Sequence, residues 1–145
     1  GIVTSVVADC RITLDQRHLE ADKLAAMYAE AQAASKRFAE EAGCTVEWER
    51  LWHIAPSPFD PELVDFCDQA IKETCGVSHR LPSGPLHDAA EVCMAGVPTV
   101  MMFVQSLHGI SHNKIEDTKE EHIAMSVEAL DRLAEKTMAW IKAKS

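Results

Sequence analysis

The apolar run VPTVMMFV, residues 97–104, constrains the fold of this chain more than any other feature. A run of this kind that follows Gly96 is typical of a strand buried on both faces. Such strands occur in parallel sheets whose two faces are covered by helices. Cys10–Leu14 and Cys44–Trp52 alternate apolar with polar residues, which predicts two half-buried strands. The sequence therefore predicts an α/β fold.

Apolar residues at helical spacing predict helices between and after these segments. The predicted helices span residues 20–42, 60–75 and 88–95 and a last segment that starts at Thr118. Asp60 followed by Pro61 is a strong helix start, because an Asp side chain caps the first turn and proline suits the first helical position. Gly43 and Gly76 are well placed to end the first two helices.

The last predicted helix starts with a capping box, Thr118 with Glu121 three residues later. An apolar stripe along this helix is expected to face the core. The stripe consists of Ile123, Val127, Leu130, Ala134, Met138 and Ile141.

Prolines at positions 56, 58 and 61 interrupt regular structure and mark a connection between two parts of the chain. We therefore expect one domain to end near residue 54 and another to begin near residue 55. The sequence predicts that residues 1–54 and residues 55–145 belong to different domains.

Net charge and cysteine content indicate which partners and which cellular compartment the sequence favours. The formal net charge of −9 disfavours nucleic acid and anionic membranes, which both select clustered basic residues. The chain has no apolar run of the roughly 20 residues that a membrane helix needs. Five cysteines without a Cys-x-x-Cys pair indicate buried thiols in a reducing cytoplasm. The first residue is not Met and lies in an apolar segment, which suggests a fragment.

The loop LHGISHNKIEDT, residues 107–118, leaves the carboxyl end of the predicted buried strand. Ligand sites of open α/β sheets lie at this end of the strands. Imidazole is the commonest side-chain ligand for zinc, so His108 and His112 are candidate ligands. The alternative is that both histidines are solvated, since one imidazole cannot hold a metal that needs about four ligands.

A second candidate stretch is LPSGPLHDA, residues 81–89. Gly84 and Pro85 force a turn, and His87 and Asp88 follow at the start of a short helix. A histidine at this position can donate to a developing oxyanion. In the alternative interpretation Asp88 only caps the helix and His87 is exposed.

The ordered motifs ITLDQRH, ERLWHIAPSPFDPELV, LPSGPLHDA, PTVMMFV and GISHNKIEDT resemble the C-terminal part of the amidase, hydantoinase/carbamoylase family. These metal-dependent hydrolases include N-carbamoyl-L-amino acid hydrolases, allantoate amidohydrolases and β-ureidopropionases. The resemblance implies a zinc-aminopeptidase-like α/β catalytic domain and a smaller α+β lid domain through which subunits form a homodimer. It places residues 1–54 in the lid and residues 55–145 in the C-terminal part of the catalytic domain.

The resemblance also implies roles for individual residues. His112 matches the last histidine ligand of a site for two divalent ions, zinc or manganese. Arg17 matches the lid arginine that pairs with the carboxylate of a small-molecule substrate. His87 matches a catalytic histidine that lies against the substrate and stabilises the tetrahedral intermediate. No role carries over to His108.

The chain also departs from the family pattern. Thr4 replaces the usual asparagine of the substrate site, the usual Ser-Gly-Ala-Gly-His-Asp reads SGPLHD, and Lys114 replaces a proline. The other metal ligands and the general-base glutamate belong to an N-terminal remainder that this chain lacks.

Together these features predict the C-terminal portion of a binuclear metal amidohydrolase that cleaves carbamoyl or amide C–N bonds. In this interpretation the fragment alone is inactive and holds no metal. A non-catalytic oligomerisation module of the same fold and an aminopeptidase-like peptidase are the alternatives.

Overall fold

A computed structural model describes residues 3–145 of the chain. The chain divides into two compact units, Gly1–Pro56 and Ser57–Ser145, at the proline-rich connection. The division lies close to the predicted boundary, but the assignment of the two units to a lid and a catalytic domain stays a prediction.

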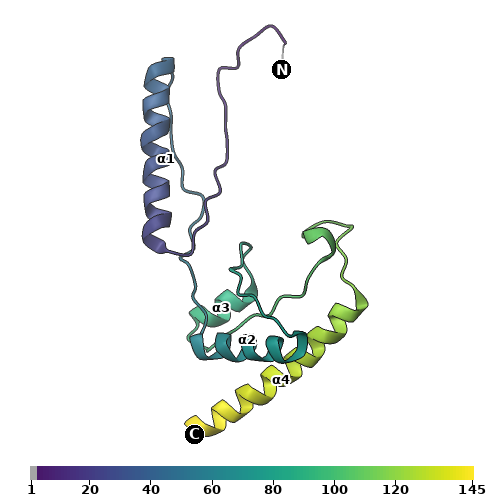
Figure 1. The fold of residues 1–145 in the computed structure, drawn as a ribbon. Helices are drawn as coiled ribbons and strands as arrows, with labels where there is room; N and C mark the ends of the chain where they lie inside the picture. Colours follow the sequence, from purple (N-terminus) through teal and green to yellow (C-terminus); the bar gives the residue numbers. More distant parts are fainter. Residues whose placement is uncertain (1–2) are drawn as a thin grey trace. The chain divides into compact units, whose positions relative to one another are not determined.

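The first unit contains helix α1, Ala21–Ala42, as the apolar spacing predicts. It ends where Gly43 adopts a left-handed conformation with φ 64°, which a residue without Cβ adopts without strain. Two extended segments run alongside α1 (Figure 1). Trp48 attaches the second segment to α1, since its ring meets that of Tyr28 edge-on at 5.5 Å and its Nε1–H donates to Ser35 Oγ at 2.8 Å.

The second unit contains α2, α3, a short 3₁₀ helix η1 and α4. Their bounds are Pro61–Cys75, Asp88–Met94, Leu107–Gly109 and Glu120–Lys144. The predicted start of α2 is confirmed, because Asp60 Oδ1 accepts from Leu63 N–H at 3.0 Å and Pro61 opens the helix. Gly76 ends α2 with φ 77°. The helix predicted over residues 88–95 is confirmed as α3.

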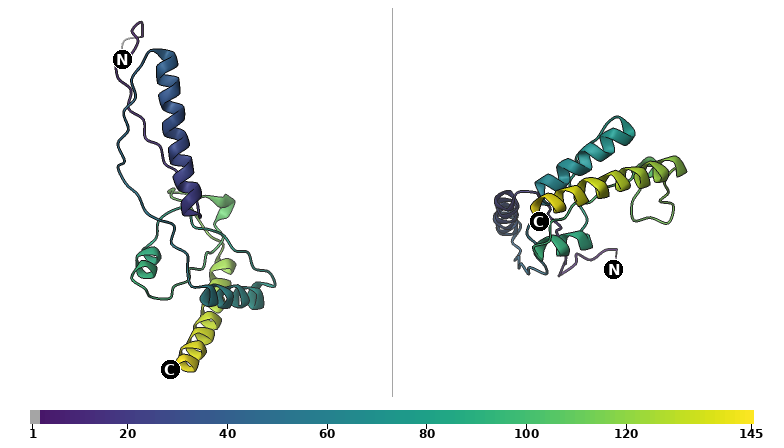
Figure 2. Two further views of the ribbon diagram at one scale, coloured as in Figure 1. Left: turned by 90° about the vertical axis from the view of Figure 1, so that its left-hand side faces the viewer. Right: turned by 90° about the horizontal axis from the view of Figure 1, so that it is seen from below.

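The core of the second unit lies between α2 and α4, which cross in the left view of Figure 2 and lie next to each other in the right view. Cys67, Ala70 and Leu133 form the buried cluster, and Val100 and Met102 of the extended segment pack against it. Two ion pairs tie the helices together, Lys136 to Glu73 at 2.8 Å and Lys144 to Glu62 at 2.6 Å. Glu62 lies near the start of α2 and pairs near the end of α4, whereas Glu73 lies near the end of α2 and pairs further back along α4. The two helices are therefore antiparallel.

The prediction for the buried face of α4 is wrong. The buried residues of α4 are Ala129 and Leu133, whereas Leu130 of the predicted stripe is 55% exposed and Val127 is 63% exposed. The helix therefore meets α2 with a different face, on which small Ala129 permits close approach. The capping box is also wrong, because α4 starts one position later, with Lys119 at the N-cap and no side-chain cap.

The strand predictions are not met by residues 3–145, none of which forms a β-strand. Residues 10–14, 44–52 and 97–104 instead run without regular structure. A strand is defined by hydrogen bonds to a neighbouring strand, and these segments have no such neighbour in the described part of the chain. The three predicted strands are therefore wrong for these residues, whose regular structure is helical. Over the same residues, no helix is long and apolar enough to cross a membrane.

Candidate functional site

His112 lies in an exposed loop between η1 and α4. The loop is closed at its base by a backbone hydrogen bond in which Leu107 N–H donates to Asp117 O at 2.7 Å. His112 has a φ of 56°, in the left-handed region that non-glycine residues seldom adopt. Its own backbone N–H donates to Glu116 Oε2 at 2.8 Å. The loop thus fixes the backbone of the predicted ligand through a carboxylate.

Glu116 is not among the site residues that the sequence predicts. The signal was available, because a carboxylate four residues after His112 in a short loop can reach back to a free N–H. What the sequence could not show is the left-handed backbone at His112, which turns that N–H toward the carboxylate.

His108 shares several properties of His112. It is exposed, lies in η1 and has a φ of 58°. Exposure and backbone conformation therefore do not distinguish the two histidines, and the role of His112 still rests on its motif.

His87 occupies the N-cap position of α3 and is half-buried. Its ring meets Phe103 of the extended apolar segment, with ring centroids 6.3 Å apart and an interplanar angle of 66°. The alternative in which Asp88 caps α3 is wrong, because Asp88 is the first helical residue and no side chain caps this helix. The imidazole of His87 thus has an aromatic neighbour from the extended segment.

Arg17 lies in the first unit and forms a hydrogen-bonded ion pair with Asp15. Its Nε donates to Asp15 Oδ1 at 3.1 Å, and its terminal nitrogen donates to Oδ2 at 2.6 Å. The hydrogen bond from Arg17 lowers the pKa of Asp15, and the same bond raises the pKa of the guanidinium. Both side chains are more than half exposed, so the pair adds little stability. The guanidinium nonetheless has the fork geometry that binds carboxylates.

A complete metal site is not formed by residues 3–145. Among them no group of three or more His, Cys, Asp or Glu side chains could hold a metal ion. Divalent ions such as zinc take about four ligands, and His112 can supply one. Of the two-metal site that the resemblance implies, residues 3–145 could therefore supply the His112 imidazole, which is a suitable ligand by its chemistry, but not a complete set of ligands.

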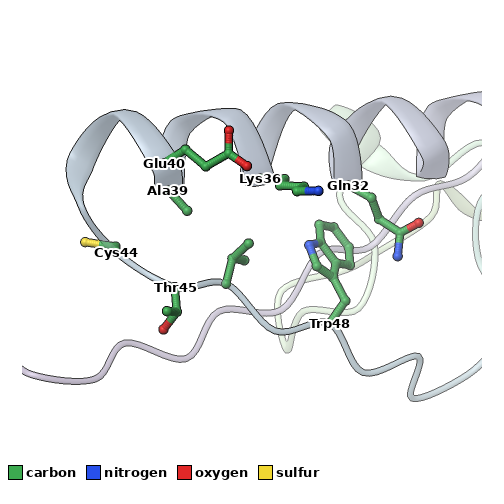
Figure 3. A pocket seen from close by; sticks show the side chains of 8 residues that line it. Gln32, Lys36, Ala39, Glu40, Cys44, Thr45 and Trp48 are labelled. Atoms are coloured by element: carbon green, nitrogen blue, oxygen red, sulfur yellow. The ribbon is translucent and has the colours of Figure 1, made fainter.

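A pocket of about 380 Å³ lies in the first unit between α1 and the segment that follows it (Figure 3). Trp48, Lys36 and Gln32 line it together with Cys44, whose thiol is exposed. Arg17, His87 and His112 are not among its lining residues.

Comparison with known proteins identifies the family. The model of peptidase family M20/M25/M40 matches residues 2–136, which is most of the chain. The chain belongs to this family. Membership in peptidase family M20/M25/M40 supports a zinc-peptidase-like α/β fold, although the described residues are helical.

Curated relatives agree with the family resemblance drawn from the motifs, which is confirmed. The chain is 36% identical to an N-carbamoyl-L-amino-acid amidohydrolase of Rhizobium meliloti over 81% of this chain and 28% of that protein. It is 29% identical to the allantoate amidohydrolase of Escherichia coli (strain K12), over 97% of this chain and 34% of the relative. This member of the M20/M25/M40 family thus spans about a third of these relatives. No solved structure matches the chain.

Proposed function

We propose that the intact enzyme containing this chain is an amidohydrolase that cleaves a carbamoyl or amide C–N bond of N-carbamoyl amino acids or allantoate. The observation that carries the proposal is the 36% identity to an N-carbamoyl-L-amino-acid amidohydrolase over 81% of the chain. Similarity to an allantoate amidohydrolase over 97% of the chain supports the same reaction type. Both relatives are named for hydrolysis of an amide-like bond.

In this proposal Arg17 binds the carboxylate of a small-molecule substrate. Its guanidinium already holds the carboxylate of Asp15 through two nitrogens, so its geometry suits a second carboxylate of the same shape. Substrate binding would then require Asp15 to share the guanidinium or to release it.

His87 is proposed to stabilise charge on the substrate during catalysis. Its position at the start of α3 and its packing on Phe103 hold the imidazole on an ordered part of the chain. A donor fixed before the reaction stabilises a developing oxyanion without a reorganisation cost.

His112 is proposed to be a ligand for one of two divalent ions, zinc or manganese, in the intact enzyme. Since residues 3–145 do not hold a complete metal site, the other ligands must come from protein outside them. We therefore assign His112 a ligand role only and describe no catalytic step at the ions. A homodimer formed through the Gly1–Pro56 unit and a cytoplasmic location complete the proposal.

A substrate panel tests the proposed reaction. The intact enzyme is assayed with an N-carbamoyl-L-amino acid, allantoate and a dipeptide, in the presence of zinc or manganese. We expect hydrolysis of the carbamoyl amino acid or of allantoate and no cleavage of the dipeptide. Cleavage of the dipeptide alone would replace the proposal by an aminopeptidase-like activity.

The second candidate is a non-catalytic oligomerisation role for this polypeptide. It is favoured by the incomplete set of metal ligands in residues 3–145. If the intact enzyme hydrolyses none of the three substrates but forms stable oligomers, this candidate becomes the better one.

A further inference from the structure

We propose that Glu116 is a positioning residue that holds the backbone of His112 in the conformation its role requires. The inference rests on the ligand role proposed for His112. Its direct basis is the hydrogen bond from His112 N–H to Glu116 Oε2 at 2.8 Å.

The backbone of His112 needs such a partner. A φ of 56° places Cβ close to the following carbonyl, so residues other than glycine adopt this conformation only where the surroundings hold it. The N–H at this residue is exposed, and water would otherwise compete for it. A carboxylate is a stronger acceptor than water or an amide, since bonds to charged groups are roughly twice as strong as neutral ones.

Glu116 is itself held in place by the same short loop. Its backbone N–H donates to Asn113 O at 2.9 Å, while its side chain reaches back to residue 112. Asn113 Oδ1 in turn accepts from Ile115 N–H at 3.2 Å. The backbone and the side chain of Glu116 thus bond to two successive residues of the loop, and together they fix the direction in which the side chain of His112 leaves the backbone.

The base of the loop does not depend on this carboxylate. Leu107 N–H donates to Asp117 O independently of any side chain. The neighbouring carboxylate of Asp117 accepts from Thr118 N–H at 2.8 Å. Replacement of Asp117 therefore removes the same charge from the same loop without touching His112, which makes it a matched control.

The test compares three variants of the intact enzyme, Glu116→Ala, Glu116→Gln and Asp117→Ala. Three quantities are measured for each variant: the rate of amide hydrogen exchange at residue 112, the metal content and kcat. We expect exchange at His112 to become about tenfold faster in Glu116→Ala. Glu116→Gln keeps an acceptor oxygen and should stay within about threefold of wild type. Asp117→Ala should leave exchange at His112 unchanged. Metal content and kcat should fall in Glu116→Ala and recover in Glu116→Gln.

Three outcomes separate this inference from the proposed function. Unchanged amide exchange at His112 in Glu116→Ala overturns the positioning role. An increase in exchange in Glu116→Gln as large as that in Glu116→Ala overturns it as well. Faster exchange with unchanged kcat and metal content overturns the ligand role of His112, while Glu116 still holds its backbone.

Discussion

His108 and His112 are both exposed, and both have a left-handed backbone, so they form a natural pair of variants. We expect His112→Asn in the intact enzyme to reduce metal content and to lower kcat by at least about 100-fold, because loss of a ligand costs more than loss of a ligand's hydrogen-bond partner. Asparagine is chosen because it tolerates a positive φ.

His108→Asn is the matched control and should retain both metal content and kcat. Metal content is measured by elemental analysis of the purified protein. If metal content and kcat fall equally in the two variants, the defect lies in the loop as a whole and His112 has no special role.

Arg17 provides the second prediction for a single residue. We expect Arg17→Lys in the intact enzyme to raise KM for an N-carbamoyl amino acid about tenfold, because an ammonium cannot reproduce the two-point contact with a carboxylate. KM for the corresponding amide substrate should change little. Arg11→Lys, on the same exposed segment, is the control and should leave both KM values unchanged.

The pairing with Asp15 gives the competing explanation for Arg17. If Arg17 only holds Asp15, activity on the acid and on the amide should fall equally in Arg17→Lys. That result would show that Arg17 has a structural role and does not bind the substrate carboxylate.

At the scale of elements, α4 packs with the face that carries Ala129 and Leu133. We expect Leu133→Ala to lower the free energy of unfolding of the second unit by about 2–3 kcal/mol, because the side chain is 6% exposed and sits in the buried cluster. Leu130→Ala, on the same helix, should change it by less than about 0.5 kcal/mol, since Leu130 is 55% exposed.

Chemical denaturation of the 145-residue chain, followed by circular dichroism, measures both variants. If Leu130→Ala lowers the free energy of unfolding more than Leu133→Ala does, α4 packs with the stripe that the sequence predicts.

At the scale of the whole molecule, large apolar side chains are exposed in both units. Among them are Leu51 at 72% and Trp52 at 71% in the first unit and Phe103 at 47% in the second. Uncovered apolar surface of this extent favours association with other protein surfaces.

We therefore expect the 145-residue chain by itself to form dimers or larger species and to lack amidohydrolase activity, even with added zinc or manganese. Light scattering at several protein concentrations measures the first property, and release of the free amino acid from its carbamoyl derivative measures the second. A monodisperse monomer that hydrolyses the substrate would contradict both parts, and would mean that His87, His108, His112 and nearby carboxylates form a complete site.

Features that depend on neighbours along the chain could be predicted from the amino-acid sequence. Asp60 and Pro61 start α2, and Gly76 ends it, because capping and left-handed termini involve only residues within one turn. The ordered series of motifs, which includes those around His87 and His112, carried the family resemblance, and the match over residues 2–136 confirms it. Such signals need no knowledge of the tertiary structure.

Which surfaces meet depends on tertiary contacts and could not be predicted from the sequence. Helix α4 has apolar residues on more than one face, and contact with α2 selects the face of Ala129 and Leu133. The apolar run at residues 97–104 satisfies the pattern of a strand, but a strand also needs a partner for its backbone, which no pattern within one segment supplies. The bond from His112 to Glu116 likewise depends on a backbone angle, and the loop that sets this angle is closed by residues ten positions apart, Leu107 and Asp117.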